Sequence, residues 1–295
     1  MTLLTPPPST AAPRPSRALP SPLLAEARAE ILTALGPRAA GLEVARAVVG
    51  LFFIGVQLSD GAAGAAATPL DGLGRAVCCP SSVEAWPFPG KLAGRRAVDL
   101  LDELAETGVR RAVGLATLNA LAESLWRVSP PEGVEIESGR DAFDAAAIAP
   151  GERVVVVGAF PPFLRALKRM GQDHLVLETD PAKLKADELP RFRPPEQALE
   201  TVAEADVLLI TGTTLLNDTL EPLLAAARPG ARTVMVGPSA GLWPFPYFRR
   251  RVALLGGIRV TAPEAFLAVL AEGGSGYHFL GRSAEKVVLR PASVG

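Results

Sequence analysis

The stretch ADVLLITGTTLLNDTLEPLL, residues 205–224, predicts a strand, a tight loop and a helix in immediate succession. Residues 206–210 form a short apolar run, which is typical of a strand buried on both faces. The loop from Thr211 to Thr214 is small and rich in hydroxyls, and a helix is expected to begin near Asn217 or Asp218, both good N-cap residues. Such a junction directs N–H groups and hydroxyls to the carboxyl end of a strand, where open α/β sheets bind ligands. An ordinary turn that binds nothing is the alternative.

From residue 151 onward, strand-like and helix-like segments alternate regularly. This pattern predicts an α/β, Rossmann-like domain with a mainly parallel, doubly wound sheet. The expected strands cover residues 153–157, 174–177, 206–210, 233–236 and 258–261, with 287–289 as a last edge strand. The strand at 258–261 is followed by an expected helix over 263–272.

The first half of the chain has a different texture, which predicts a smaller α+β unit with antiparallel pairing. Residues 1–20 are rich in Pro, Ala, Ser and Thr and are expected to form a disordered tail. Ser21 is the expected N-cap of a helix over 21–35, and the Gly/Ala-rich residues 61–68 are expected to form a loop. The remaining expected elements are strands over 43–49, 51–58 and 74–79, and helices over 94–106 and 109–126.

The break around Pro130 and Pro131 marks a domain boundary between about residues 128 and 150. We therefore divide the chain into a tail (1–20), a smaller domain (21–140) and a Rossmann-like domain (141–295).

Composition excludes some partner classes and leaves others open. The 295 residues carry a net charge of −1, so no basic surface argues for nucleic acid and no charge block argues for a membrane. Cys78 and Cys79 are the two cysteines, and adjacent cysteines rarely pair with each other, which fits a cytoplasmic protein. The oligomeric state stays open, with a homodimer as one alternative.

The candidate ligand-binding residues follow the ends of the predicted parallel strands, and we expect them to face a common cleft. Glu178 lies about twenty residues after Gly158, where an acidic side chain would meet the ribose hydroxyls of an adenosine-type ligand. The loop GAFPPF lacks two of the three glycines of a standard dinucleotide cradle, and Glu178 could equally be a solvated strand end. The full candidate set is Gly158, Phe160, Glu178, Thr211, Gly212, Thr213, Thr214, Asn217, Gly237 and Ser239.

Other polar residues offer weaker signals. His174 is expected to have a structural role in a buried strand, whereas His278 follows a Gly-rich loop and could reach a ligand. No His, Cys or carboxylate motif has metal-ligand spacing, and Cys78–Cys79 is an incomplete site for a soft metal. Residues 249–251, three arginines, predict either a solvated helix face or an anion contact beside residues 243–247.

Several segments resemble the putative heavy-metal chelation domain family. They are the opening stretch, VVVVGAFPPF (154–163), TVMVGPSAGLWP (233–244) and RVTAPEAFLAVLAEGG (259–274). AVGLATLNALAESLW (112–126) is similar to the last helix of the enolase N-terminal-like domain that precedes this family's Rossmann-like domain. The resemblance implies two packed domains with a cleft between them. This chain departs from it at Ala159, where the resemblance leads us to expect a histidine or another polar residue.

These observations favour binding of a small anionic or polar ligand, such as a metal chelate or a cofactor-like molecule, in the interdomain cleft. A nucleotide-like or pterin-like compound and a divalent metal are the candidate ligands, and turnover stays open. Metal handling without catalysis and regulatory binding are the alternatives. We expect the loop at 61–68 to act as a lid, and replacement of Thr213 and Thr214 by valine to abolish binding.

Overall fold

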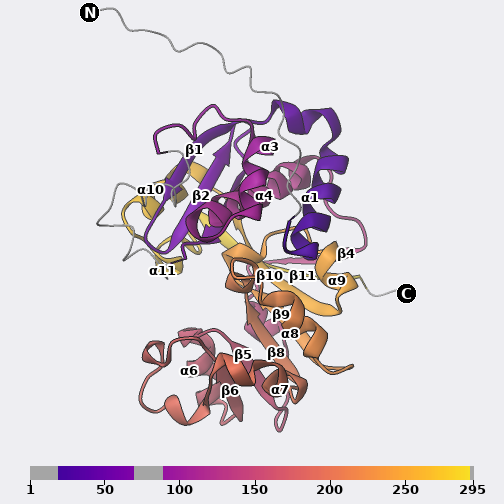
Figure 1. The fold of residues 1–295 in the computed structure, drawn as a ribbon, viewed down its shortest axis with the longest axis vertical. Helices are drawn as coiled ribbons and strands as arrows, with labels where there is room; N and C mark the ends of the chain where they lie inside the picture. Colours follow the sequence, from indigo (N-terminus) through magenta and orange to yellow (C-terminus); the bar gives the residue numbers. More distant parts are fainter. Residues whose placement is uncertain (1–18, 70–88, 293–295) are drawn as a thin grey trace, which may run out of the picture.

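The computed structural model describes residues 19–69 and 89–292. Most of the expected tail, the expected strand at 74–79 and both cysteines lie outside these residues. The described chain forms a three-stranded sheet at one end of the molecule and an eight-stranded sheet that reaches the other end (Figure 1).

The large sheet is mainly parallel, as predicted. Six strands, in the order β7-β6-β5-β8-β9-β10, run parallel to one another, and β11 and β4 add an antiparallel margin. Numbered along the chain, the six parallel strands have the 3-2-1-4-5-6 order of the doubly wound dinucleotide-binding fold. The bounds of all eight strands of this sheet are β4 (Val134–Ser138), β5 (Val154–Val157), β6 (His174–Leu177), β7 (Phe192–Arg193), β8 (Val207–Thr211), β9 (Arg232–Val236), β10 (Val252–Val260) and β11 (Ala284–Pro291).

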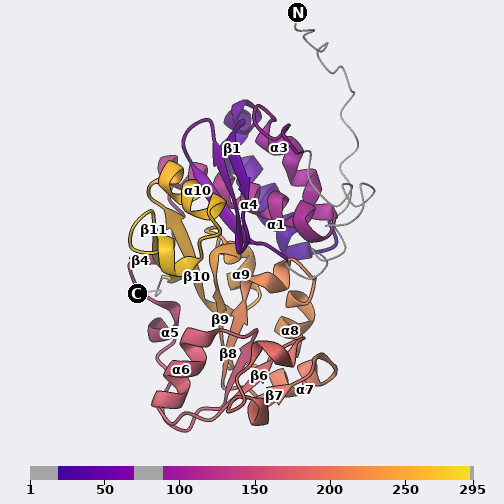
Figure 2. The ribbon, with the colours of Figure 1, turned by 90° about the vertical axis from the view of Figure 1, so that its left-hand side faces the viewer.

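Helices cover both faces of the large sheet, because its central strands are apolar on both sides. Val154 and Val156 pack with one helical layer, whereas Val155 and Val157 belong to the core on the opposite face. Figure 2 shows the two layers on either side of the strands. One layer contains α5 (Ala142–Ala145) and α6 (Pro161–Arg169), and the other contains α7 (Ala198–Ala203), α8 (Leu220–Ala226) and α9 (Phe245–Arg249).

The small sheet is an antiparallel meander of β1 (Val44–Val49), β2 (Phe53–Leu58) and β3 (Ala63–Ala67). The long helix α4 (Gly108–Val128) packs on one face of it, next to α1 (Pro22–Leu35) and α3 (Ala97–Leu100). Ser21 caps α1 as predicted, because its Oγ accepts a hydrogen bond from the N–H of Leu24. The expected helix over 94–106 is shorter, and it ends in a 3-10 turn over Leu101–Ala105.

The prediction of a loop at residues 61–68 was wrong, because β3 occupies most of it. This strand lies so close to α4 that a Cβ on Gly64 would overlap the backbone of Ala116 and Ala120. The small residues that suggested a loop are therefore what permits this packing. A buried strand of this kind cannot act as the expected lid.

Two further strand predictions were also wrong in part. β10 begins at Val252 rather than at residue 258, and its two glycines hid the strand pattern. Gly256 lies against Ala142 and Gly257 against the carbonyl of Gly241, so neither position has room for a side chain. β11 is not the edge strand, because β4 pairs with its outer side.

The two halves of the chain share their cores. α10 (Pro263–Ala271) and α11 (Gly276–Phe279) come from the second half but cover the other face of the small sheet. In both views α10 lies beside β1 (Figures 1 and 2). β4 precedes residue 140 and yet lies in the large sheet. The division at residue 140 stays a prediction.

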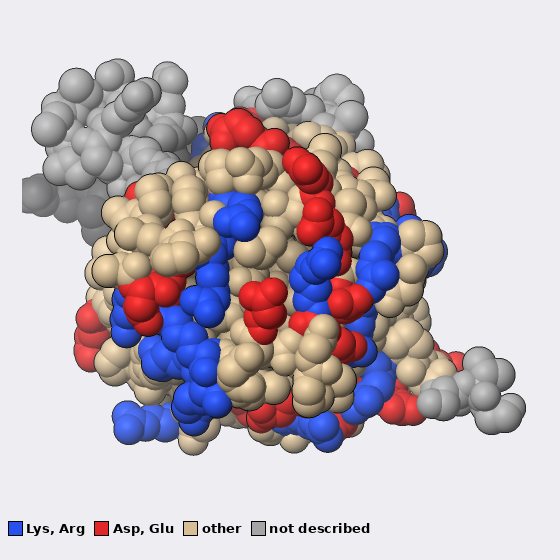
Figure 3. All heavy atoms as spheres, turned by 90° about the horizontal axis from the view of Figure 1, so that it is seen from below, with Lys and Arg blue, Asp and Glu red and all other residues tan. Residues whose placement is uncertain are grey.

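The helices in the described parts of the chain include none with the length and apolar character needed to cross a membrane. The lower end of the molecule carries acidic and basic side chains side by side (Figure 3).

Candidate ligand site

The site is centred where the strand order reverses, between β5 and β8. These neighbouring parallel strands are connected outward to opposite sides of the sheet, and in open α/β sheets ligands bind in a crevice beyond the carboxyl ends of such strands. Gly158 follows β5 with φ +95°, and a Cβ there would lie 2.9 Å from Cγ2 of Thr211 at the end of β8. Glycine is therefore required at this position both by its backbone conformation and by the contact.

The loop directly after β8 carries an exposed threonine and a buried one. Thr213 is exposed, and its hydroxyl donates to Oγ1 of Thr211 over 3.1 Å. Thr214 is buried and donates to the carbonyl of Thr211 over 2.7 Å, so its hydroxyl has a local structural partner. Gly212 is also buried, and a 3-10 turn over Gly212–Leu215 follows the strand.

The predicted helix after this loop begins at Leu220, slightly later than expected. Asn217 is exposed and accepts hydrogen bonds from the hydroxyl (2.7 Å) and the N–H (3.3 Å) of Thr219. Asn217 therefore orders the segment leading into α8.

Glu178 holds the loops after β5 and β6 together. Its Oε2 accepts from the N–H of Ala159 (2.9 Å), and its Oε1 accepts from the N–H (2.7 Å) and the hydroxyl (2.9 Å) of Thr179. Burial alone would raise the pKa of Glu178, but these hydrogen bonds and the Lys183 ammonium together lower it below its ordinary value. The carboxylate is thus ionised and fixed between the loops after β5 and β6.

Phe160 adds an aromatic surface to the loop after β5. Its ring stacks on Phe163 with the centroids 5.0 Å apart, and it is partly accessible. The ring therefore lies at the N-cap of α6, beside the end of β5.

The loop after β9 is mainly a docking point for the small sheet. Ser239 is buried, and its Oγ accepts from the N–H of Ala67 at the end of β3 over 2.8 Å. Gly237 precedes it with φ +118°, and its N–H donates to the carbonyl of Gly256. The hydroxyl of Ser239 is therefore already used within the protein.

The structure places all ten predicted residues at or after the carboxyl ends of parallel strands, at one edge of the large sheet. It brings Gly158 against Thr211, and Gly212 against Ser239. Thr213 and Asn217 are exposed, whereas Gly212, Thr214 and Ser239 are buried. Ligand binding by these residues stays a prediction.

Two polar residues of α4 support these loops and were not predicted. Nδ2 of Asn119 donates to the carbonyls of Ala65 (2.8 Å) and Pro238 (3.3 Å). Arg111 is fully buried, and its Nη1 donates to the Asp218 carboxylate over 2.6 Å. The available signal was a charged or amide side chain within a helix made largely of small and apolar residues.

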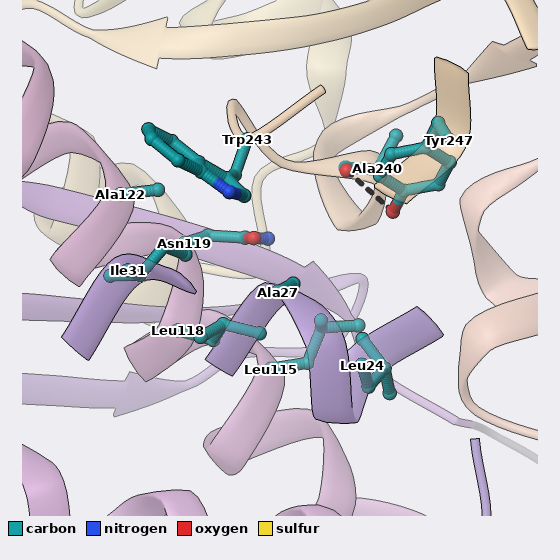
Figure 4. A pocket seen from close by; sticks show the side chains of 10 residues that line it. All are labelled: Leu24, Ala27, Ile31, Leu115, Leu118, Asn119, Ala122, Ala240, Trp243 and Tyr247. Atoms are coloured by element: carbon teal, nitrogen blue, oxygen red, sulfur yellow. Dashed lines mark hydrogen bonds between the residues drawn. The ribbon is translucent and has the colours of Figure 1, made fainter. Parts of the chain in front are cut away.

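A small pocket lies between the two halves of the chain, where α1 and α4 meet the segment after β9 (Figure 4). Its lining is mostly aliphatic, and it has room for roughly one water molecule. Of its polar groups, the Tyr247 hydroxyl donates to the carbonyl of Ala240 over 2.8 Å, and Nε1 of Trp243 donates to Glu30 over 2.7 Å. This pocket is distinct from the candidate ligand site at the ends of β5 and β8.

The remaining sequence candidates have structural partners. His174 is buried at the start of β6 and burial lowers its pKa, which fits the structural role expected for it. His278 accepts a hydrogen bond through Nδ1 from the N–H of Ser275 and so caps its own short helix. Arg249 and Arg250 form ion pairs with Glu26 on α1, so these two are neither a free solvated face nor an open anion site.

Comparison with known families assigns the chain. A family model described as "Putative heavy-metal chelation" (DUF364) matches residues 141–289. The chain belongs to this family. A second model with the same description (DUF4213) matches residues 32–122.

Relatives of this heavy-metal chelation family share the fold. Crystal structures of DUF364 proteins of unknown function from Pyrococcus horikoshii and Desulfitobacterium hafniense are 19% and 20% identical to this chain. Each has a TM-score of 0.68 and covers 90% of this chain and 98% of its own. A protein of Methanocaldococcus jannaschii is 29% identical over 141 residues, which is 46% of this chain and 49% of the relative. The match thus spans about half of the relative's length.

The description of the heavy-metal chelation family points to metal binding. Within residues 19–69 and 89–292, however, no three His, Cys, Asp or Glu side chains are grouped to hold a metal ion. The described side chains therefore do not supply the three or four protein ligands of a closed zinc site or the six or more oxygens of a calcium site.

Proposed function

We propose that the chain binds a small polar or anionic organic molecule, carrying a metal as its chelate, in the crevice beyond β5 and β8. The observation that carries the proposal is the contact between Gly158 and Thr211 at the reversal of strand order. In open α/β sheets this is the place where ligands bind.

The chemistry of the loops supports a polar organic ligand. Thr213 offers a hydroxyl, Asn217 an amide, and Glu178 a carboxylate that is held ionised between two loops. Phe160 offers a partly open ring for a planar group. Together, these polar groups and the aromatic ring can recognise the shape and the hydrogen-bonding groups of an organic molecule.

A chelate reconciles these loops with the family's description. Because the described residues contain no metal-binding cluster, most ligands of a bound metal would have to come from the organic molecule. The protein then recognises the chelate through its organic part. Catalysis on such a molecule would be a further step.

Native mass spectrometry with metal analysis on the same freshly purified sample tests the proposal. We expect a small organic molecule bound in a one-to-one ratio, and any metal should leave together with it. Metal that remains in a one-to-one ratio after every organic molecule has been removed would show that protein side chains hold it, which contradicts the proposal.

A further inference from the structure

A second pocket lies at the opposite edge of the large sheet, where β9 and β10 begin. It is formed between the end of α8 and the turn after α9. Arg228, Arg250 and Arg251 line it together with Gly230 and Thr233, and none of its lining residues is acidic. The lining of the pocket therefore carries three guanidinium groups, and the pocket is separate from the candidate ligand site beyond β5 and β8.

The three arginines differ in how far they are already paired. Arg250 donates through Nε to both carboxylate oxygens of Glu221 over 2.9 Å, and Arg228 pairs with Asp206. Arg251 is exposed, and within the described chain its guanidinium has no hydrogen bond or ion pair. One complete guanidinium is thus available at the pocket.

The backbone at Arg251 gives an independent reason to look for a role of its side chain. Arg251 has φ +61°, and its N–H donates to the carbonyl of Phe248 at the end of α9. This is the left-handed position after a helix at which glycine is favoured. The turn alone gives no reason for an arginine, so strain at this position points to a function of the guanidinium.

We propose that this pocket binds a small oxyanion, a phosphate or sulfate group, through Arg251 with support from Nη1 of Arg228. Arg228 uses Nε on the carbonyl of Ala205 and Nη2 on Asp206, which leaves Nη1 for the anion. The pocket has room for roughly one or two water molecules, enough for the inserted oxygens of one tetrahedral group. A planar guanidinium binds two of those oxygens at once.

Isothermal titration with inorganic phosphate, at constant ionic strength and against a chloride blank, tests the proposal on the full chain. We expect saturable one-to-one binding that weakens as salt increases. Parallel titration with glycerol phosphate distinguishes a free anion from the phosphate of a larger molecule, because tighter binding of the ester indicates the larger molecule. Absence of saturable binding of either compound would overturn the proposal.

Two variants of Arg251 separate the charge from the backbone strain. R251Q keeps the strained turn and should weaken phosphate binding by about tenfold. R251G removes the charge and the backbone strain, so it should lose phosphate binding. Its melting temperature should rise by about 2 °C, because glycine relieves the strain. R282Q removes an exposed arginine elsewhere and should leave binding unchanged. Wild-type phosphate binding by R251Q and R251G would overturn the proposal.

Discussion

Gly158 is the residue on which the geometry of the crevice depends. Replacing it with alanine introduces a left-handed backbone penalty and a Cβ that lies 2.9 Å from Thr211. We expect G158A to lower the free energy of unfolding by about 2–3 kcal/mol in urea denaturation. G171A is the matched control, because Gly171 has φ +64° but no atom within 4 Å of the added Cβ.

The control should lose only about 1 kcal/mol, since it carries the backbone penalty alone. Equal losses of unfolding free energy in G158A and G171A would mean that the added Cβ does not clash with Thr211. The close approach of the loop after β5 to the end of β8 would then be wrong.

Glu178 contributes a pH dependence whose sign follows from its lowered pKa. The carboxylate form is stabilised in the folded protein, so its contribution is fully present above the unfolded pKa of about 4.5 and is lost as the pH falls through the lower folded pKa. E178Q should lower the free energy of unfolding by about 1–3 kcal/mol at pH 7. Melting temperatures between pH 7 and pH 3 should converge for wild type and E178Q. A difference that is constant with pH would contradict the role of the ionised carboxylate.

At the scale of elements, β3 consists of glycine and alanine, which are residues that do not predict a strand from sequence. A valine at position 64 would collide with the backbone of α4, which cannot move without disturbing its contacts with α1 and the loop after β9. We expect G64V to lower the free energy of unfolding by about 3 kcal/mol or more. A45V, on an exposed position of β1, should change it by less than about 0.5 kcal/mol. Similar stabilities of G64V and wild type would show that β3 does not pack as described.

The elements that could be predicted are those whose pattern is local. Four-residue runs such as Val154–Val157 and His174–Leu177 are continuous and apolar apart from His174, and each is bounded by a turn, so strand and loop positions followed directly. β3 and the first half of β10 could not be predicted in this way. Their glycines and alanines serve contacts with α4, α5 and the loop after β9, which are distant in sequence.

The candidate site shows the same division. The positions of Gly158, Glu178 and Thr213 at one edge followed from the alternation of strands and helices. The hydrogen bond from the N–H of Ala67 to Ser239 depends on how the two halves of the chain pack together. The same is true of the hydrogen bonds by which Asn119 and Arg111 support the loops. No local sequence pattern indicates how the halves pack.

At the scale of the whole molecule, a charged network joins α1 to the second half of the chain. Glu26 receives hydrogen bonds from Arg250 and Arg249, which lower its pKa to about 2. Its contribution is present above the ordinary pKa of 4.5 and is lost as the pH falls toward about 2. The protection of the α1 amides, that is, their exchange rate corrected for the intrinsic pH dependence of amide exchange, should therefore fall in that interval. E26Q should exchange rapidly already at pH 7, and unchanged exchange in E26Q would show that the network does not hold α1.

Binding of a ligand between the β5 and β8 loops is tested most directly by replacing Thr213, whose hydroxyl is exposed at the crevice, while its fold-determining neighbours are kept. Native mass spectrometry should show that T213V retains at least about tenfold less of the co-purifying molecule than wild type, because valine keeps the shape but not the hydrogen bond. T213S should retain most of it, and T261V, which changes an exposed threonine beyond β10, should retain all of it. Wild-type occupancy in T213V would contradict the placement of the site.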